Sequence, residues 1–112
     1  MTEQWVECLY FPNYEVSNLG NVRRKKDGKL LKQYQQKSGY VNVWLTRGLG
    51  SMSVPVHRLA CIAFHGEEGY IKGLFVDHIN TDRADNRADN LHWVTPLENM
   101  HNPITISKRK KK

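Results

Sequence analysis

The sequence predicts an α+β fold, in which a small N-terminal antiparallel β region precedes a unit of strand, loop, strand and helix. Three observations carry this prediction. Residues 40–46 alternate between aliphatic and other side chains, clusters of Asn, Asp and Gly separate short apolar segments, and residues 95–98 have the pattern that begins a helix. At 112 residues, the chain has room for one compact domain or for two subdomains that share a core.

The first half has the pattern of short strands joined by turns. The period of two at 40–46 predicts a strand with one aliphatic face. Short extended segments are also expected at Trp5-Val6 and at 14–16, and a further strand is expected at 52–56. Asn and Gly tolerate positive φ, and Asp-Gly favours hairpins. Turns are therefore expected where these residues cluster, at 17–21, 26–29 and 48–51.

A helix is expected over residues 57–64, where apolar residues recur at helical spacing and His65-Gly66 supplies a stop. His57 and His65 lie at the two ends of this helix, and either could be a metal ligand or a catalytic group. Histidines beside apolar stripes are more often structural groups that form hydrogen bonds. We therefore expect a structural role for both.

The second half has a different pattern, with a strand, a long polar loop, a second strand and a helix. The strands are expected at 74–78 and 91–94. Thr95 as N-cap, Pro96 at the first helical position and Glu98 three residues after the cap predict the final helix. The loop's aspartates do not have the spacing of a calcium-binding EF-hand, because the required glycine and terminal glutamate are missing. They are expected to accept local backbone hydrogen bonds.

The net charge of +6 suits a polyanionic partner. No apolar run approaches the roughly 20 residues that span a bilayer, and the N-terminus has no secretory pattern, so we expect a cytoplasmic protein without membrane association. Cys8 and Cys61 lie in apolar contexts and are expected to be buried free thiols. Two basic clusters are expected to contact phosphate groups: Arg23, Arg24, Lys25 and Lys26, and Lys108, Arg109 and Lys110 with the two lysines that follow.

Asp77 and His78 stand together at the end of the strand at 74–78. A carboxylate suits hard divalent cations, and an imidazole can take up a proton near neutral pH. Neighbours in a strand point to opposite faces, but the end of the strand is expected to let both turn toward the final helix. On that helix, Asn99 and His101 are about 200° apart and cannot both face the strands. The amide would favour Mg²⁺ or Mn²⁺, and the imidazole Zn²⁺ or Ni²⁺.

Three segments follow one another in an informative order: Val76-Asp77-His78-Ile79-Asn80, Asp89-Asn90-Leu91-His92-Trp93-Val94-Thr95 and Glu98-Asn99-Met100-His101-Asn102. With the segments 56–64 and 14–23, they resemble the HNH homing endonuclease family. This family includes phage intron-encoded and free-standing members, often fused to a small N-terminal nuclease-associated module. The resemblance covers the chain from Trp5 to about Asn102.

The resemblance implies an HNH ββα-metal motif that hydrolyses phosphodiester bonds of DNA. His78 would be the general base that activates water. Asp77 and Asn99 would bind one divalent metal, with Mg²⁺ expected before Mn²⁺ and Zn²⁺. Asn90 would support the site and help to orient His78, and it is preferred to Asn86 because it directly precedes the second strand.

The same resemblance divides the chain into an N-terminal β module at 1–50 that contacts DNA, an HNH nuclease domain at 51–103 and a basic tail at 104–112. The partner would be double-stranded DNA. One active site in each chain implies a nick in one strand, made by a monomer or a weak homodimer. Longer members continue into a helical DNA-reading segment, so recognition of a long site is not expected.

Two other functions remain open. A non-catalytic DNA-binding protein could have the same fold, although every expected catalytic position holds a competent residue. A basic RNA-binding protein could use aromatic side chains to stack on bases. The aromatic residues concerned are expected chiefly to pack in the core: Tyr34, Tyr40 and Trp44.

Overall fold

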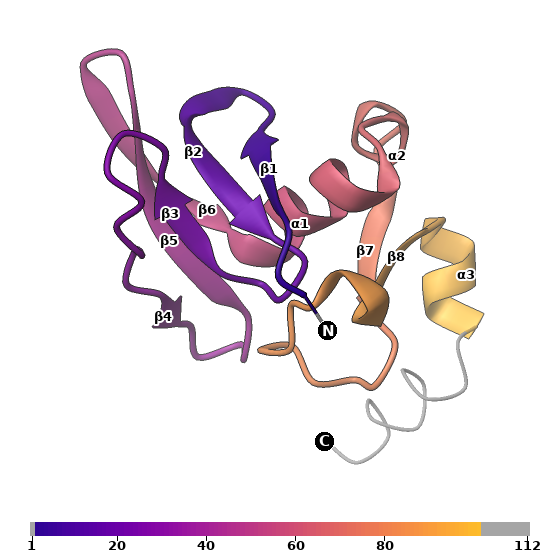
Figure 1. Cartoon of the computed structure of the whole chain (residues 1–112). Helices are drawn as coiled ribbons and strands as arrows, with labels where there is room; N and C mark the ends of the chain where they lie inside the picture. Colours follow the sequence, from indigo (N-terminus) through magenta and orange to yellow (C-terminus); the bar gives the residue numbers. More distant parts are fainter. Residues whose placement is uncertain (1, 102–112) are drawn as a thin grey trace.

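The computed structural model describes residues 2–101, and their side chains as far as Glu98. It confirms the predicted α+β fold, with antiparallel strands followed by a strand–loop–strand–helix unit (Figure 1). One sheet contains β1 (Trp5–Cys8), β2 (Phe11–Ser17) and β3 (Val22–Arg24). A second sheet contains β4 (Tyr34–Gln35), β5 (Val41–Arg47) and β6 (Gly50–Pro55). After them come α1 (Val56–His65), α2 (Glu68–Ile71), β7 (Phe75–His78), the 3₁₀ turn η1 (Ala88–Asn90), β8 (Leu91–Val94) and α3 (Pro96–His101).

Helix α1 lies at the centre of the molecule and packs against strands of all three sheets (Figure 1). The aliphatic face of β5 is buried against it, as its period of two predicts. One hydrophobic core therefore joins both halves of the chain. Its members include Cys8, Val16, Val43, Leu45, Leu59, Cys61 and Leu91.

Strands β7 and β8 form a two-stranded antiparallel ribbon that carries the second half of the fold. Asp77 is opposite His92 and His78 is opposite Leu91. Helix α1 packs on one side of this ribbon and α3 on the other (Figure 1). The predicted capping box at the start of α3 is confirmed, because the Glu98 N–H donates to Thr95 Oγ1 at 3.0 Å and the Thr95 N–H donates to Glu98 Oε1 at 2.9 Å.

Some local predictions were wrong or incomplete. Helix α2 and strand β4 are too short to have a clear pattern, and β6 begins at Gly50 instead of Met52. Tyr34 and Trp44 were expected in the core, but their side chains are 42% and 57% exposed. The alternation that buries the aliphatic residues of β5 turns Trp44 to solvent. Among the described residues, no helix is long and apolar enough to cross a membrane.

Candidate functional site

The candidate site is at the end of β7, where Asp77 and His78 are 7% and 6% exposed. Pairing with β8 continues through His78, so the alternation of the strand persists to its last residue. His78 therefore does not turn toward α3 as expected. Its ring lies 5.4 Å, between centroids, from that of His57 on α1, whereas Asp77 belongs to the opposite face of the ribbon.

Asp77 is held by its neighbour across the ribbon. Its Oδ2 lies 2.8 Å from Nε2 of His92, the residue directly opposite in register. The charge of His92 contributes to lowering the pKa of Glu98 on α3. His92 and Asp77 therefore lie on the side of the ribbon that faces α3. The alternation of β8 could have identified His92 as this cross-strand partner.

His78 lies beside two aromatic rings and one side-chain amide. Its Nε2 is 2.8 Å from Oδ1 of Asn86, and its ring centroid is 5.9 Å from that of Tyr40. An amide oxygen can only accept, so the proton of the neutral imidazole is on Nε2. Nδ1 then has the free lone pair that a general base needs.

Burial lowers the pKa of His78 below its usual value. The hydrogen bond with Asn86 and the charges of Asp77, Asp82 and Asp85 act in the opposite direction and only partly offset this effect. At neutral pH the imidazole is therefore neutral and able to accept a proton.

Asn90 does not contact His78 in the way that the sequence suggested. Its Oδ1 accepts from the Asn80 N–H at 3.0 Å, and its Nδ2 donates to the Asp85 carbonyl at 2.8 Å. Its backbone carbonyl accepts from the Ile79 N–H at 2.8 Å, which closes the base of the loop. Asn90 thus holds the loop closed, and the described amide that contacts His78 is that of Asn86.

The loop between the strands is organised by its own polar side chains. Asp82 Oδ1 accepts from the Ala84 N–H at 3.0 Å, which confirms the expected local bonding. Asp85 is bound through both oxygens by the Arg87 guanidinium, each at 2.9 Å, and this interaction lowers its pKa to about 2. These acids are engaged in shaping the loop.

The two histidines that border α1 differ in role. His65 Nε2 donates to the Ala88 carbonyl at 2.7 Å, so its predicted structural role is confirmed. His57 is largely buried between Tyr40 and His78, at ring-centroid distances of 5.1 and 5.4 Å. Among the described residues, its Nδ1 has no hydrogen-bond partner. His57 therefore belongs to the surroundings of the candidate base.

The position of His57 predicts a loss of stability in acid. Burial, followed by the charges of His78 and Arg58, lowers its pKa from 6.5 to about 4. The unfolded chain then binds more protons between these values, so the free energy of unfolding falls as pH falls, by at most about 1.4 kcal/mol for each pH unit. Urea unfolding at pH 7 and pH 5 measures this loss, and His57→Leu should reduce it. An equal loss in the variant would assign the effect to other groups.

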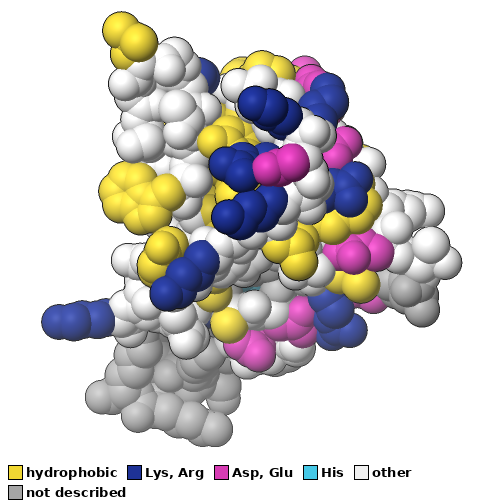
Figure 2. All heavy atoms as spheres, turned by 60° about the vertical axis from the view of Figure 1, so that its left-hand side comes forward, with side chains coloured by type: hydrophobic (Ala, Val, Ile, Leu, Met, Phe, Trp, Pro, Cys, Tyr) yellow, Lys and Arg dark blue, Asp and Glu magenta, His cyan; other side chains and the backbone are white. Residues whose placement is uncertain are grey.

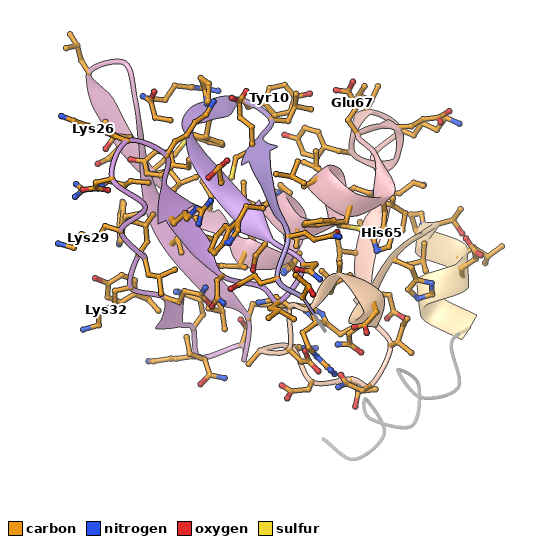
Figure 3. The ribbon with its side chains drawn as sticks, in the orientation of Figure 1. Tyr10, Lys26, Lys29, Lys32, His65 and Glu67 are labelled. Atoms are coloured by element: carbon orange, nitrogen blue, oxygen red, sulfur yellow. The ribbon has the colours of Figure 1, made fainter. Side chains whose placement is uncertain are left out.

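The first basic cluster is largely paired within the N-terminal sheet. Arg23 binds Glu15 at 2.9 Å, Arg24 binds Asp27 at 2.7 Å, and Lys25 binds Glu7. Lys26 is exposed and points outward along the same edge as two lysines not singled out from the sequence, Lys29 and Lys32 (Figure 3). Lys and Arg side chains gather on one face of the molecule with an acidic side chain among them (Figure 2).

Other predicted site residues lie outside the described part of the structure. The side chain of Asn99 belongs to this group, although the backbone of α3 packs against β7 and β8. So do Lys108, Arg109 and Lys110 of the second basic cluster. Among the described residues, no three side chains of His, Cys, Asp or Glu gather as a metal site. Of the two predicted metal ligands, only Asp77 has its side chain in the described part of the structure.

Comparison with known proteins gives matches to both halves of the chain. A family model described as HNH endonuclease matches residues 54–101, and the model of the NUMOD4 motif matches residues 3–46. The chain is 41% identical to DNA endonuclease I-HmuI of Bacillus phage SP01, over 86% of its own length and 54% of that protein. It is 38% identical to an uncharacterized HNH endonuclease of Acanthamoeba polyphaga mimivirus, over 96% of its own length and 29% of that protein.

A solved structure has the same architecture. It is described as DNA binding and cleavage by the HNH homing endonuclease I-HmuI, and it superposes with a TM-score of 0.76 at 37% sequence identity. The match covers 96% of this chain and 64% of that one. The chain thus spans about half the length of the first of these curated relatives and less of the second.

Proposed function

Because this chain belongs to the HNH endonuclease family, we propose that it is a metal-dependent endonuclease that hydrolyses phosphodiester bonds of double-stranded DNA. The observation that carries this proposal is the end of β7, where a buried carboxylate and a buried neutral imidazole lie on opposite faces of one ribbon. A phosphate laid across that end would meet a metal ligand on one side and a base on the other.

The metal would be held by Asp77 together with Asn99 of α3. Asp77 fits this role, because its carboxylate is a hard oxygen donor, is buried, and is oriented by His92. When bound, a divalent cation would stabilise charge on the scissile phosphate and on the leaving oxygen. An oxygen donor set of one carboxylate and one amide favours Mg²⁺, with Mn²⁺ as a substitute.

His78 would act as general base through Nδ1. It would take a proton from water as the water oxygen forms a bond to phosphorus and the bond to the 3′ oxygen breaks. Asn86 would hold the tautomer that leaves Nδ1 free to accept this proton. Asn90 would keep the loop closed around this pair.

The DNA would lie across both modules and be nicked in one strand, since the described residues hold one such site. We assign residues 1–50 to DNA contact, 51–103 to cleavage and 104–112 to phosphate binding, with the protein acting as a monomer or weak homodimer inside the cell that holds its target. Lys26 of the first cluster, with Lys29 and Lys32 on the same edge, is better suited to phosphate than Arg23, Arg24 and Lys25, which already have carboxylate partners.

A second candidate function is binding of RNA or single-stranded DNA. The exposure of Tyr34 and Trp44 favours it, because exposed aromatic rings can stack on unpaired bases. Competition of duplex DNA and single-stranded RNA for the protein distinguishes the two functions. Preference for the RNA would support this alternative.

Nicking of supercoiled plasmid tests the proposed function directly. The protein should convert it to the open circle with Mg²⁺ or Mn²⁺ and should leave it intact in EDTA. Asp77→Asn should lose this metal-dependent nicking, because a neutral amide binds a divalent cation more weakly than a carboxylate. Asp82→Asn, an exposed loop acid whose local bond an amide oxygen can replace, should retain it. A folded protein that nicks with neither metal would contradict the proposal.

A further inference from the structure

The turn at residues 17–21, which joins β2 to β3, is firmly built and belongs to the N-terminal module. Ser17 is fully buried, and its Oγ accepts from the N–H groups of Leu19 and Asn21 at 3.2 and 3.1 Å. Asn18 fastens the turn to the segment before β1, because its Oδ1 accepts from the Gln4 N–H at 2.7 Å. The position of this turn is therefore set by the N-terminal sheet.

The same turn packs against the loop that carries Asn86. The Asn18 carbonyl accepts from the Ala88 N–H at 2.8 Å. Gly20 has a φ of +85°, and a Cβ built on it would lie 3.0 Å from both the carbonyl carbon and the carbonyl oxygen of Asn86. Such an approach is tighter than nine in ten real Cβ contacts, and the neighbour is backbone that cannot rotate away. Only glycine fits there without a shift.

The side chain of Asn86 depends on the contact between its own backbone and this turn. Its side chain is bound through Oδ1 to His78, and among the described residues its Nδ2 has no hydrogen-bond partner. Apart from this one hydrogen bond and the packing around a residue that is 4% exposed, the direction of the amide depends on the position of its own main chain. That main chain is what the turn contacts.

We propose that the turn at 17–21 is a positioning element of the cleavage site, which fixes the backbone of Asn86 and through it the imidazole of His78. A second contact from the N-terminal module acts on the same loop, since Arg83 Nη1 donates to the Ser38 carbonyl at 2.7 Å. The N-terminal module would then do more than hold DNA. This inference rests on the proposed function, because it assigns the turn a part in that reaction.

Two glycine variants test this inference in the full chain. Gly20 and Gly28 both have positive φ, at +85° and +69°, so alanine strains the backbone at either position. Only at Gly20 does the new methyl group meet Asn86, because nothing lies within 4 Å at Gly28. Gly20→Ala should slow single-turnover nicking at saturating DNA and Mg²⁺ at least tenfold, with the DNA dissociation constant within twofold. Because Gly28 lies between Lys26 and Lys29, Gly28→Ala is compared with the wild type only at saturating DNA, where its rate should be the same, whatever its DNA dissociation constant.

The ¹⁵N chemical shifts of the His78 ring report its tautomer. A general loss of stability would leave these chemical shifts unchanged in the folded protein. At fixed pH without metal, Gly20→Ala should shift them toward a mixture of the two tautomers, and Gly28→Ala should not. Equal rates in the two variants, with unchanged resonances, would overturn the inference. If the wild-type protein cuts no DNA, the proposed function fails, but the resonances still decide whether the turn positions the imidazole.

A milder pair of variants covers the case in which Gly20→Ala does not fold. Asn18→Ala removes the acceptor that ties the turn to Gln4, whereas Asn18→Asp keeps it. Asn18→Ala should slow nicking severalfold at saturating DNA and move the His78 resonances in the same direction. Asn18→Asp should restore both. Slow nicking in Asn18→Ala without any change at His78 would contradict the proposed path.

Discussion

Replacement of His78 with alanine should slow DNA nicking by about 10²- to 10⁴-fold, the usual contribution of a general base. The imidazole is buried and neutral, and Asn86 leaves its Nδ1 free to accept a proton. Asp77, its neighbour in β7, lies on the opposite face of the ribbon and cannot take its place. DNA affinity, measured in EDTA, should stay within twofold, because His78 is 6% exposed and offers little surface to DNA.

Imidazole added to His78→Ala distinguishes chemistry from structure. If the side chain acts as a base, a free imidazole entering the vacated space should recover part of the rate. Circular dichroism and a melting curve establish whether the variant is folded. A folded variant that nicks at the wild-type rate would show that the base has been wrongly assigned.

Replacement of Gly69 with alanine should destabilise the protein by about 1–3 kcal/mol, the usual cost of forcing an extra group into a packed site. Gly69 is buried in α2, and a Cβ there would overlap the indole of Trp93 on β8. Helix propensity favours alanine by roughly 1 kcal/mol, so the steric conflict and helix propensity act in opposite directions. We expect the conflict to prevail, because the indole is also held by its Nε1–H donating to the Gly66 carbonyl at 3.0 Å.

Gly50→Ala is the matched control for this change. Gly50 has no positive φ, and nothing lies within 4 Å of a Cβ built on it. Its free energy of unfolding in urea should stay within about 0.5 kcal/mol of wild type, as is usual for surface substitutions. In a background with Trp5 and Trp44 replaced by Phe, Trp93 fluorescence should shift to longer wavelength in Gly69→Ala if the indole moves toward solvent. A Gly69→Ala protein as stable as Gly50→Ala would mean that Trp93 repacks without cost.

The features that the sequence predicted correctly depend on short-range patterns. Each of three features follows from residues that are only a few positions apart in the sequence. They are the strand at 91–94, the capping box at Thr95 and Glu98, and the buried aliphatic face of β5. The exposure of Trp44 followed from the same alternation and was missed, because aromatic character was given more weight than position along the strand. A consistent use of period two would have predicted it.

The partner of His78 could not be predicted in the same way. The loop repeats Arg-Ala-Asp-Asn twice, so Asn86 and Asn90 have nearly the same local sequence. Which of them meets the imidazole depends on the path of the loop, and that path is set by contacts with residues almost 70 positions earlier, at Asn18 and Gly20. Distant contacts of this kind leave no periodic signal in the sequence.

The burial of both cysteines has a practical consequence for following this protein on DNA. Cys8 and Cys61 are 1% and 0% exposed, and burial raises the pKa of each thiol to about 12, so neither offers a reactive thiolate near neutral pH. Leu49, at the tip of the β5–β6 hairpin, is fully exposed. A cysteine placed there could carry a fluorescent dye or spin label on the otherwise natural chain. Under the proposed function, such a probe would report the approach of a duplex from the tip of this hairpin.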